Sequence, residues 1–138
     1  MEAGIANAQK SPTLFWALAT ADQTLGVSVS DVPGCQITLP HTGHYLITGV
    51  FDFWVIGAGD AAQNLIGELV NVGSGAIEAS QALFAGDDNN RGTVSNVWPV
   101  LNVTGSTSYK LRVRKAGGTG TSRVMTSHTK IAAQWSPN

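Results

Sequence analysis

One segment of the chain, residues 42–56, constrains the fold most strongly because both of its faces are largely apolar. Its sequence is TGHYLITGVFDFWVI, and as a single strand it places Tyr45, Ile47, Phe51, Phe53 and Val55 on one face. The other face carries Leu46, Val50, Trp54 and Ile56, interrupted by Thr48 and Asp52. A strand with one wet face alternates apolar and polar residues, so this strand needs cover on both sides. The segment predicts a β-sandwich that assembles with copies of itself, with Leu46, Val50, Trp54 and Ile56 as the candidate subunit interface.

Short runs rich in Val, Ile, Leu and Thr alternate with Gly-, Pro- and Asp-rich turns along the chain. They predict strands at 13–20, 25–30, 35–39, 44–56, 63–72, 77–85, 93–103, 108–115 and 122–134. Short strands at such regular spacing are typical of an antiparallel sandwich or barrel. A helix is an alternative for 61–72, where Leu65, Leu69 and Val72 have helical spacing, although Gly67 weakens it. With no linker in sight, we expect one domain, 13–138, after a flexible N-terminal arm, 1–12.

Composition and charge narrow the classes of function. The chain has 138 residues, a single-domain length, and only 12% of them are charged, about half the usual ~25%. Its net charge of −1 leaves no basic excess to neutralise phosphates, so we expect no nucleic-acid partner. No apolar run approaches the ~20 residues that span a bilayer, so we expect no membrane role. The first ten residues lack the pattern of a secretory signal, and we expect assembly in a cytoplasm.

No motif for catalysis or for metal binding is evident. The nine acidic residues are scattered, without paired carboxylates or a nucleophile beside a base, so we expect neither enzyme activity nor a cofactor. His41, His44 and His128 lack zinc-ligand spacing, and the polar loop 86–90 lacks the spacing of a calcium loop. The single Cys35 excludes an intrachain disulfide, and we expect it to be a small, semi-buried residue at the start of a strand.

The charges within predicted strands allow two interpretations each. Lys110, Arg112 and Arg114 alternate with apolar residues, which puts three cations on one outward face. That face is either a docking stripe for an acidic partner, or else a solvated strand face or a means of protecting a sheet edge. Asp52 lies inside an apolar strand, and we expect it to pair with an arginine such as Arg112 or Arg123 in a structural role.

Large rings and a proline also lie within predicted strands. Trp16, Trp54, Trp98 and Trp135 suit a core or a subunit interface, where Trp is enriched, although exposed rings can also stack on sugars. Pro99 removes a backbone donor, which predicts that 93–103 is an edge strand or carries a bulge.

The order of these features resembles a known family. The residues that carry the resemblance are VPG at 32–34, QITLP at 36–40, TGHYLI at 42–47 and YKLRVR at 109–114, before a Gly-rich hairpin. They are similar to small jelly-roll domains of tailed-phage virion proteins, which in turn resemble the trimeric C1q and tumour-necrosis-factor (TNF) fold. The resemblance implies an all-β, antiparallel jelly-roll β-sandwich of about eight strands. It also implies a homotrimer that acts by surface recognition.

Two roles use such domains, a capsid decoration or cement protein and the receptor- or glycan-binding head of a tail fibre. Only residues 1–12 precede the first predicted strand, and no heptad or shaft repeat is present, which favours decoration. We therefore expect a protein of the outer capsid surface of the virion, with the major capsid protein as its partner. The candidate capsid contacts are Ile5, Lys10 and Pro12 in the arm, together with Arg112 and Arg114.

Overall fold

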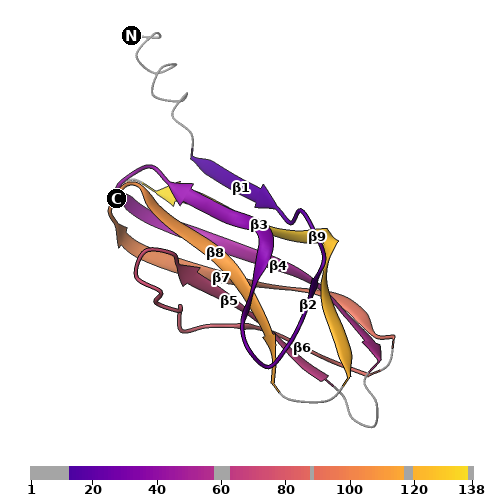
Figure 1. The fold of residues 1–138 in the computed structure, drawn as a ribbon. Helices are drawn as coiled ribbons and strands as arrows, with labels where there is room; N and C mark the ends of the chain where they lie inside the picture. Colours follow the sequence, from indigo (N-terminus) through magenta and orange to yellow (C-terminus); the bar gives the residue numbers. More distant parts are fainter. Residues whose placement is uncertain (1–12, 58–62, 88, 117–119, 137–138) are drawn as a thin grey trace, which may run out of the picture.

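The computed structural model describes residues 13–57, 63–87, 89–116 and 120–136 (Figure 1). These residues form nine strands and no helix. The strands are β1 (Leu14–Leu18), β2 (Gln23–Thr24), β3 (Ser30–Leu39), β4 (Gly43–Gly57), β5 (Gln63–Asn71), β6 (Ala82–Gly86), β7 (Arg91–Val103), β8 (Thr107–Lys115) and β9 (Thr121–Ser136). The all-β prediction is confirmed, and the helical alternative for 61–72 is wrong, because β5 occupies that region. The described residues therefore contain no helix that could span a bilayer.

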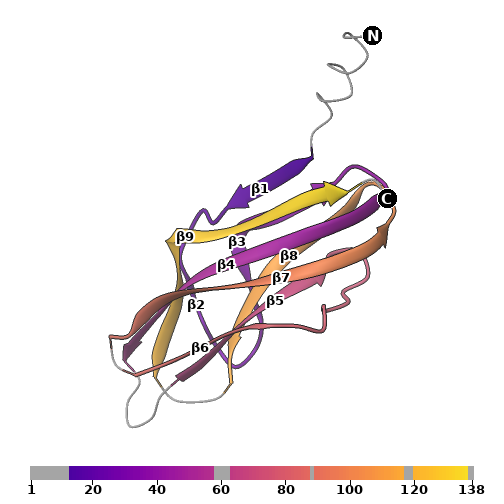
Figure 2. The same ribbon diagram turned by 180° about the vertical axis from the view of Figure 1, so that it is seen from behind.

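The strands form two antiparallel sheets that pack face to face (Figures 1 and 2). One sheet has the order β1-β9-β4-β7, with β2 also paired to β9, and the other has the order β3-β8-β5-β6. Strands that are neighbours in a sheet are mostly distant in the sequence, as in a jelly roll. The predicted jelly-roll β-sandwich is thus confirmed. We call the first sheet the β4 sheet and the second the β8 sheet.

The core lies between the two sheets and is built from alternate side chains. On β4 the core face is the odd-numbered one, as predicted, and each of its five large side chains is at most 1% exposed. Tyr109, Leu111 and Val113 of β8 meet them from the other sheet, again as predicted. Cys35 is buried among them, and burial raises the pKa of its thiol to about 12. It is therefore a core residue that stays protonated at neutral pH.

The strand boundaries on either side of Pro33 and Gly34 differ from the prediction. These two residue types usually mark turns, but here both lie inside a strand. Residues 25–29 of the predicted strand 25–30 follow β2 and belong to no strand, Ser30 begins β3, and β3 runs through Pro33 and Gly34 to Leu39. The pairing of β3 with β8 shifts register between Asp31 and Gln36, so these residues form a bulge within the strand. Gly34 has a φ of 83°, which favours glycine, and a Cβ there would lie 2.7 Å from the Leu18 carbonyl oxygen.

The predicted strand 77–85 is also shorter in the structure. Only Ala82–Gly86 forms β6, whereas Ile77 makes an isolated bridge to Val70. Pro99 lies on β7, an edge strand of the β4 sheet, which confirms the prediction made from its missing donor.

Close packing at Gly67 generates a test of the core. A Cβ on Gly67 would lie 2.5–2.6 Å from three ring atoms of Phe51, a buried side chain with no room to move aside. We expect Gly67→Ala to lower the free energy of unfolding by about 1–3 kcal/mol through overpacking. Gly57→Ala is the matched control, because a Cβ there meets nothing within 4 Å. Equal stability of the two variants in urea denaturation would contradict the packing described.

Candidate functional site

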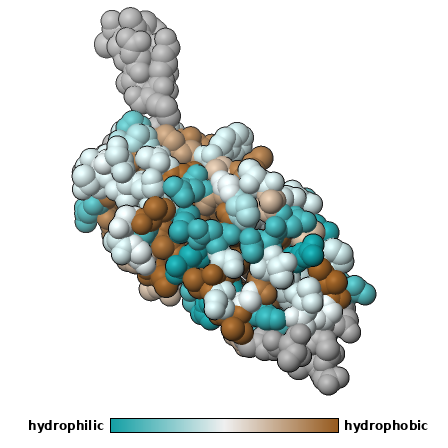
Figure 3. Space-filling view, viewed as in Figure 1, coloured by the Kyte–Doolittle hydropathy of each residue, from teal (hydrophilic) through white to brown (hydrophobic). Residues whose placement is uncertain are grey.

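The outer face of the β4 sheet exposes an unusual number of large apolar side chains. Six of them, each between 51% and 70% exposed, are Leu14, Trp16, Leu18, Leu46, Val97 and Leu101. The strand register brings four of the six together on neighbouring strands. Leu14 and Leu46 both pair with Gln134, Trp16 and Thr48 both pair with Ala132, and Thr48 also pairs with Val97. We call these six residues the apolar face. In the view of Figure 3, by contrast, hydrophobic areas are small and lie among hydrophilic ones.

The four candidate interface residues on β4 lie in different surroundings. Leu46 is exposed and belongs to the apolar face, whereas Val50, Trp54 and Ile56 are half-buried. The Trp54 ring lies under the guanidinium of Arg91, whose carbon is 5.6 Å from the ring centroid. The described residues of the chain thus leave only part of this face of β4 open, and a role in subunit contact remains a prediction for all four.

The cations of β8 are engaged in ion pairs within the chain. Lys110 Nζ lies 3.0 Å from Asp31 Oδ2, while Arg112 Nη2 and Arg114 Nε lie 3.8 and 3.6 Å from the carboxylate oxygens of Glu68. Glu68 is buried, and Arg112 and Arg114 offset its charge, whereas Lys110 is paired with Asp31. The idea that they protect a sheet edge is wrong, because β8 lies between β3 and β5.

The candidate capsid contacts are therefore only partly visible. Arg112 and Arg114 lie on the outer side of the β8 sheet, half-buried beside Glu68. Ile5, Lys10 and Pro12 lie outside the described residues. Capsid contact remains a prediction for all five.

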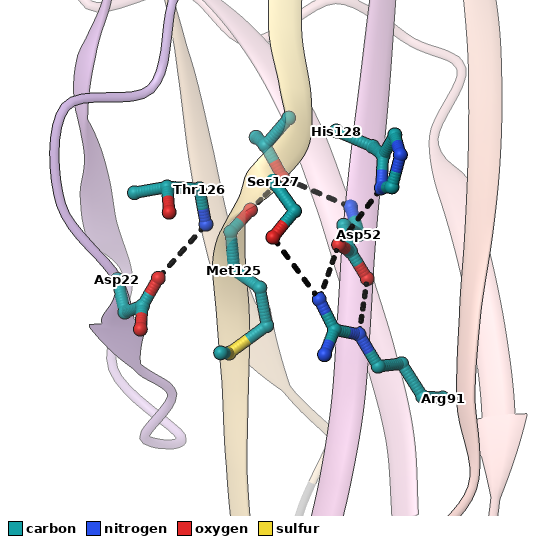
Figure 4. A network of polar contacts seen from close by, with 8 residues as sticks. Asp22, Asp52, Arg91, Met125, Thr126, Ser127 and His128 are labelled. Carbon is teal, nitrogen blue, oxygen red and sulfur yellow. Dashed lines mark hydrogen bonds and ion pairs between the residues drawn. The ribbon is translucent and has the colours of Figure 1, made fainter.

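Asp52 is the centre of a polar network that the sequence located only in part (Figure 4). The predicted partners Arg112 and Arg123 are wrong, and the partner is Arg91 of β7. Arg91 Nε donates to Asp52 Oδ1 at 3.0 Å, and its Nη2 donates to Oδ2 at 2.8 Å, which makes a bidentate pair. Asp52 is opposite Thr93 in the β4–β7 ladder, so Arg91 reaches it diagonally from two positions along. No spacing in the sequence reveals that register.

A long bulge in β9 brings further groups to Asp52. Val50 pairs with Lys130 but Asp52 pairs with Met125, so the four residues 126–129 of β9 lie opposite the single residue Phe51 of β4 and form a bulge. The Thr129 hydroxyl repairs the ladder there, since it accepts from the Asp52 N–H at 2.9 Å and donates to the Met125 carbonyl at 2.6 Å. The Thr126 N–H donates to Asp22 Oδ1 at 2.8 Å. Side-chain oxygens thus replace backbone partners that the bulge removes.

The charge of Asp52 is stabilised although the residue is only 2% exposed. Burial raises the pKa of its carboxyl, but hydrogen bonds from Arg91 and His128 outweigh burial and hold that pKa below its ordinary value. Solvent is close, because the side chain of Arg91 is 41% exposed and that of His128, whose Nδ1 lies 3.4 Å from Asp52 Oδ2, is 72% exposed. Asp52 is therefore an ionised carboxylate covered by one layer of side chains.

This network has the form of a structural ion pair. The Ser127 hydroxyl accepts from Arg91 Nη2 at 3.4 Å, and within the described residues no hydrogen bond joins it to His128. Nucleophilic catalysis needs a hydroxyl paired with its base, and that contact is not made here.

The remaining titratable candidates have other surroundings. The His41 ring stacks on Trp135 at 4.1 Å between centroids, and His44 Nδ1 accepts from the Asn102 N–H. Among the residues that the structure describes, no three His, Cys, Asp or Glu side chains gather as metal ligands.

Trp98 is buried in the core, where its Nε1 donates to the Ser80 carbonyl at 2.7 Å.

Comparison with solved structures finds the same fold in proteins of distant sequence. The chain is similar to Eiger TNF from S. frugiperda, with a TM-score of 0.57 and 14% identity over 92% of this chain and 95% of that one. It is similar to the globular domain of zebrafish complement 1qA, with a TM-score of 0.52 and 12% identity over 92% and 100%. A third similar chain is VP2 of the infectious bursal disease virus subviral particle, with a TM-score of 0.58 and 14% identity.

The match to VP2 covers 91% of this chain but 33% of the viral one. No family model and no curated protein matches the sequence. These likenesses show the fold alone, a jelly-roll β-sandwich that the chain shares with Eiger TNF, with complement 1qA and with VP2 of infectious bursal disease virus.

The ion pair at Asp52 generates a test of stability. We expect Asp52→Asn to lower the free energy of unfolding at pH 7 by about 1–3 kcal/mol, because it leaves Arg91 without its charged partner. Asp31→Asn, at the exposed pair with Lys110, should cost less than about 1 kcal/mol. The folded pKa of Asp52 lies below its unfolded value, so its stabilisation is present above about pH 4 and is lost as the pH falls through the folded pKa. Urea denaturation from pH 7 to pH 3 measures this, and an unchanged acid response in Asp52→Asn would contradict it.

Proposed function

We propose that the protein is a structural protein of a virion, a capsid decoration or cement protein that binds the outer capsid surface as a homotrimer. Its partners are further copies of itself and the major capsid protein. The observation that carries this proposal is the apolar face on a jelly-roll sandwich. Such a face suits permanent contact with another protein surface, and a cement protein acts through such contacts.

The size of the apolar face supports the proposal that the protein self-associates. Six large apolar side chains, all more than half exposed, lie on one sheet. Contiguous apolar patches of more than a few hundred Å² are rare on monomers and mark interaction sites. Trp16 is the most exposed of the six, at 70%, and buried Trp side chains dominate the energy of interfaces. Contacts between different patches on identical chains form a ring when the rotation between neighbours closes, and the number three follows from the resemblance to the trimeric C1q and TNF fold.

The likeness to VP2 supports the virion part of the proposal. VP2 forms a subviral particle, and one third of its length has the fold of this chain. In the proposed mechanism the trimer sits where capsomers meet and adds buried area across their junctions. The N-terminal arm, 1–12, and the outer side of the β8 sheet with Arg112 and Arg114 are the proposed capsid contacts.

A receptor- or glycan-binding head of a phage tail fibre is the second candidate. The observation that favours it is Trp16, whose ring stands exposed on edge strand β1, since exposed aromatic rings can stack on sugars. Its surroundings favour the first proposal, because its neighbours on the apolar face are aliphatic.

Self-association through the apolar face can be tested with one pair of variants. We expect Leu46→Lys to convert the trimer to monomers, because it buries an unpaired charge in the interface. Leu83→Lys is the control, because Leu83 is also more than half exposed but lies on β6 of the other sheet. Analytical ultracentrifugation gives the mass of each. A trimeric Leu46→Lys variant, or equal dissociation of both, would show that the face is not the interface.

The virion role is tested by the number of copies per particle. We expect quantitative mass spectrometry of purified virions to find a multiple of three, comparable with the number of major capsid protein chains. A handful of copies per particle would instead identify a tail-fibre head, and absence from virions would refute both roles.

A further inference from the structure

A second feature of the β4 sheet lies beside the apolar face and differs from it in chemistry. It is a hollow of about 470 Å³ next to the β9 bulge, within the range of small-molecule sites. Leu18, Ala19 and Val50 give it an apolar wall, and Thr93 of β7 faces them across the sheet. Residues 126–130 of β9 form the rest of its lining. We call this hollow the β9 pocket.

The polar groups of the pocket leave a surplus of positive charge. Lys130 and His128 both line it, and within the described residues Lys130 makes no ion pair. The nearest acid, Asp52, is 2% exposed and held by Arg91 through two hydrogen bonds, so it presents no free carboxylate. Asp22 is the other acid that contacts the bulge, and its Oδ1 accepts from the Thr126 N–H. An anion in the pocket therefore meets the ammonium of Lys130, and neither Asp52 nor Asp22 is part of the lining.

The hydroxyl groups at the bulge add donors beside this cation. Thr93 and Ser127 line the pocket, whereas the Thr129 hydroxyl is committed to the Asp52 N–H and the Met125 carbonyl. The network at Asp52 contacts two of the lining residues, because Arg91 Nη2 donates to the Ser127 hydroxyl at 3.4 Å and His128 Nδ1 lies 3.4 Å from Asp52 Oδ2. With Thr126, which also lines it, the site has an apolar wall, three hydroxyl residues besides Thr129 and a cation, and it is complementary to a molecule with a hydrophobic body and one carboxylate.

We propose that the β9 pocket is a binding site for a small hydrophobic carboxylate. The hydrophobic body packs on Leu18 and Val50, and the carboxylate accepts hydrogen bonds from Lys130 Nζ and from the Ser127 or Thr93 hydroxyl. His128 closes the outer side of the pocket. The proposal does not rest on the virion role, but Leu18 also belongs to the apolar face and Val50 to the candidate subunit interface, so a bound molecule and a second subunit would compete for these two side chains.

The test uses the full-length protein, labelled with ¹⁵N, and benzoate as the probe. We expect saturable shifts of the amide signals of Val50, Thr93 and 127–130 on titration with benzoate. Benzyl alcohol, which keeps the ring but lacks the charge, should bind at least about tenfold more weakly, as expected for the loss of one charge-assisted hydrogen bond. No saturable shift of these signals up to roughly 10 mM benzoate, or equal binding of the alcohol, would overturn the proposal.

Three variants test whether benzoate binding depends on the charge of Lys130 in the pocket or on positive charge elsewhere on β9. Lys130→Gln should weaken benzoate binding about tenfold or more, and Lys130→Arg should retain it. Arg123→Gln removes a cation from the same strand outside the pocket and should bind as the parent protein does. Sedimentation of each variant confirms that its assembly is unchanged. Benzoate binding by Lys130→Gln at the parent affinity, or equal weakening in Arg123→Gln, would overturn the proposal.

Discussion

The packing of β4 between β9 and β7 is the interaction on which the rest of the structure depends. β4 is paired along both edges, so its core face is placed against the β8 sheet by two ladders at once. Phe51 and Phe53 stack with their ring centroids 5.5 Å apart, and both are fully buried. Gly67 on the opposite sheet leaves the space that the Phe51 ring occupies. Once this face is sealed, the even-numbered residues of β4 must lie on the outer side of the molecule.

That outer side is divided into two parts by one charged residue. Toward the start of β4 the surface is the apolar face, which suits another protein surface. At Asp52 the strand holds a carboxylate that would be costly to bury alone, and Arg91, His128 and the β9 bulge neutralise and cover it. The bulge then shapes a polar hollow beside an apolar surface. The outer side of the β4 sheet is thus apolar toward the start of β4 and polar around the buried carboxylate of Asp52.

Much of the fold could be predicted because most strands alternate or are continuously apolar over their whole length. The predictions failed where a local signal was overruled by pairing. Pro33 and Gly34 have the composition of a turn, yet β8 continues to pair on both sides of them. The segment 77–85 has strand-like residues, but only β6 finds a partner beyond the single bridge at Ile77. The strand propensity of a segment does not reveal which other strand lies beside it.

Less of the network at Asp52 could be predicted from the sequence, because it depends on the register between strands that are distant along the chain. The two-faced character of β4 was visible in the sequence, as was the anomaly of Asp52 within an apolar run. Its partner Arg91 lies 39 residues away, and His128 lies 76 residues away. Arg112 and Arg114 had the pattern of an outward stripe, but Glu68 draws both into ion pairs.

The sequence by itself determined the class of fold and the face of β4 that enters the core, because side chains alternate with a period of two along any strand. It also determined that part of the outer face of β4 would be apolar. Only the tertiary structure decided which strands lie side by side, and hence that Leu14, Trp16, Leu46 and Val97 share one surface. It likewise decided that Asp52 meets Arg91 and that β9 bulges beside them. These features follow from strand order and register, which are set by the packing of the whole chain rather than by any local stretch of it.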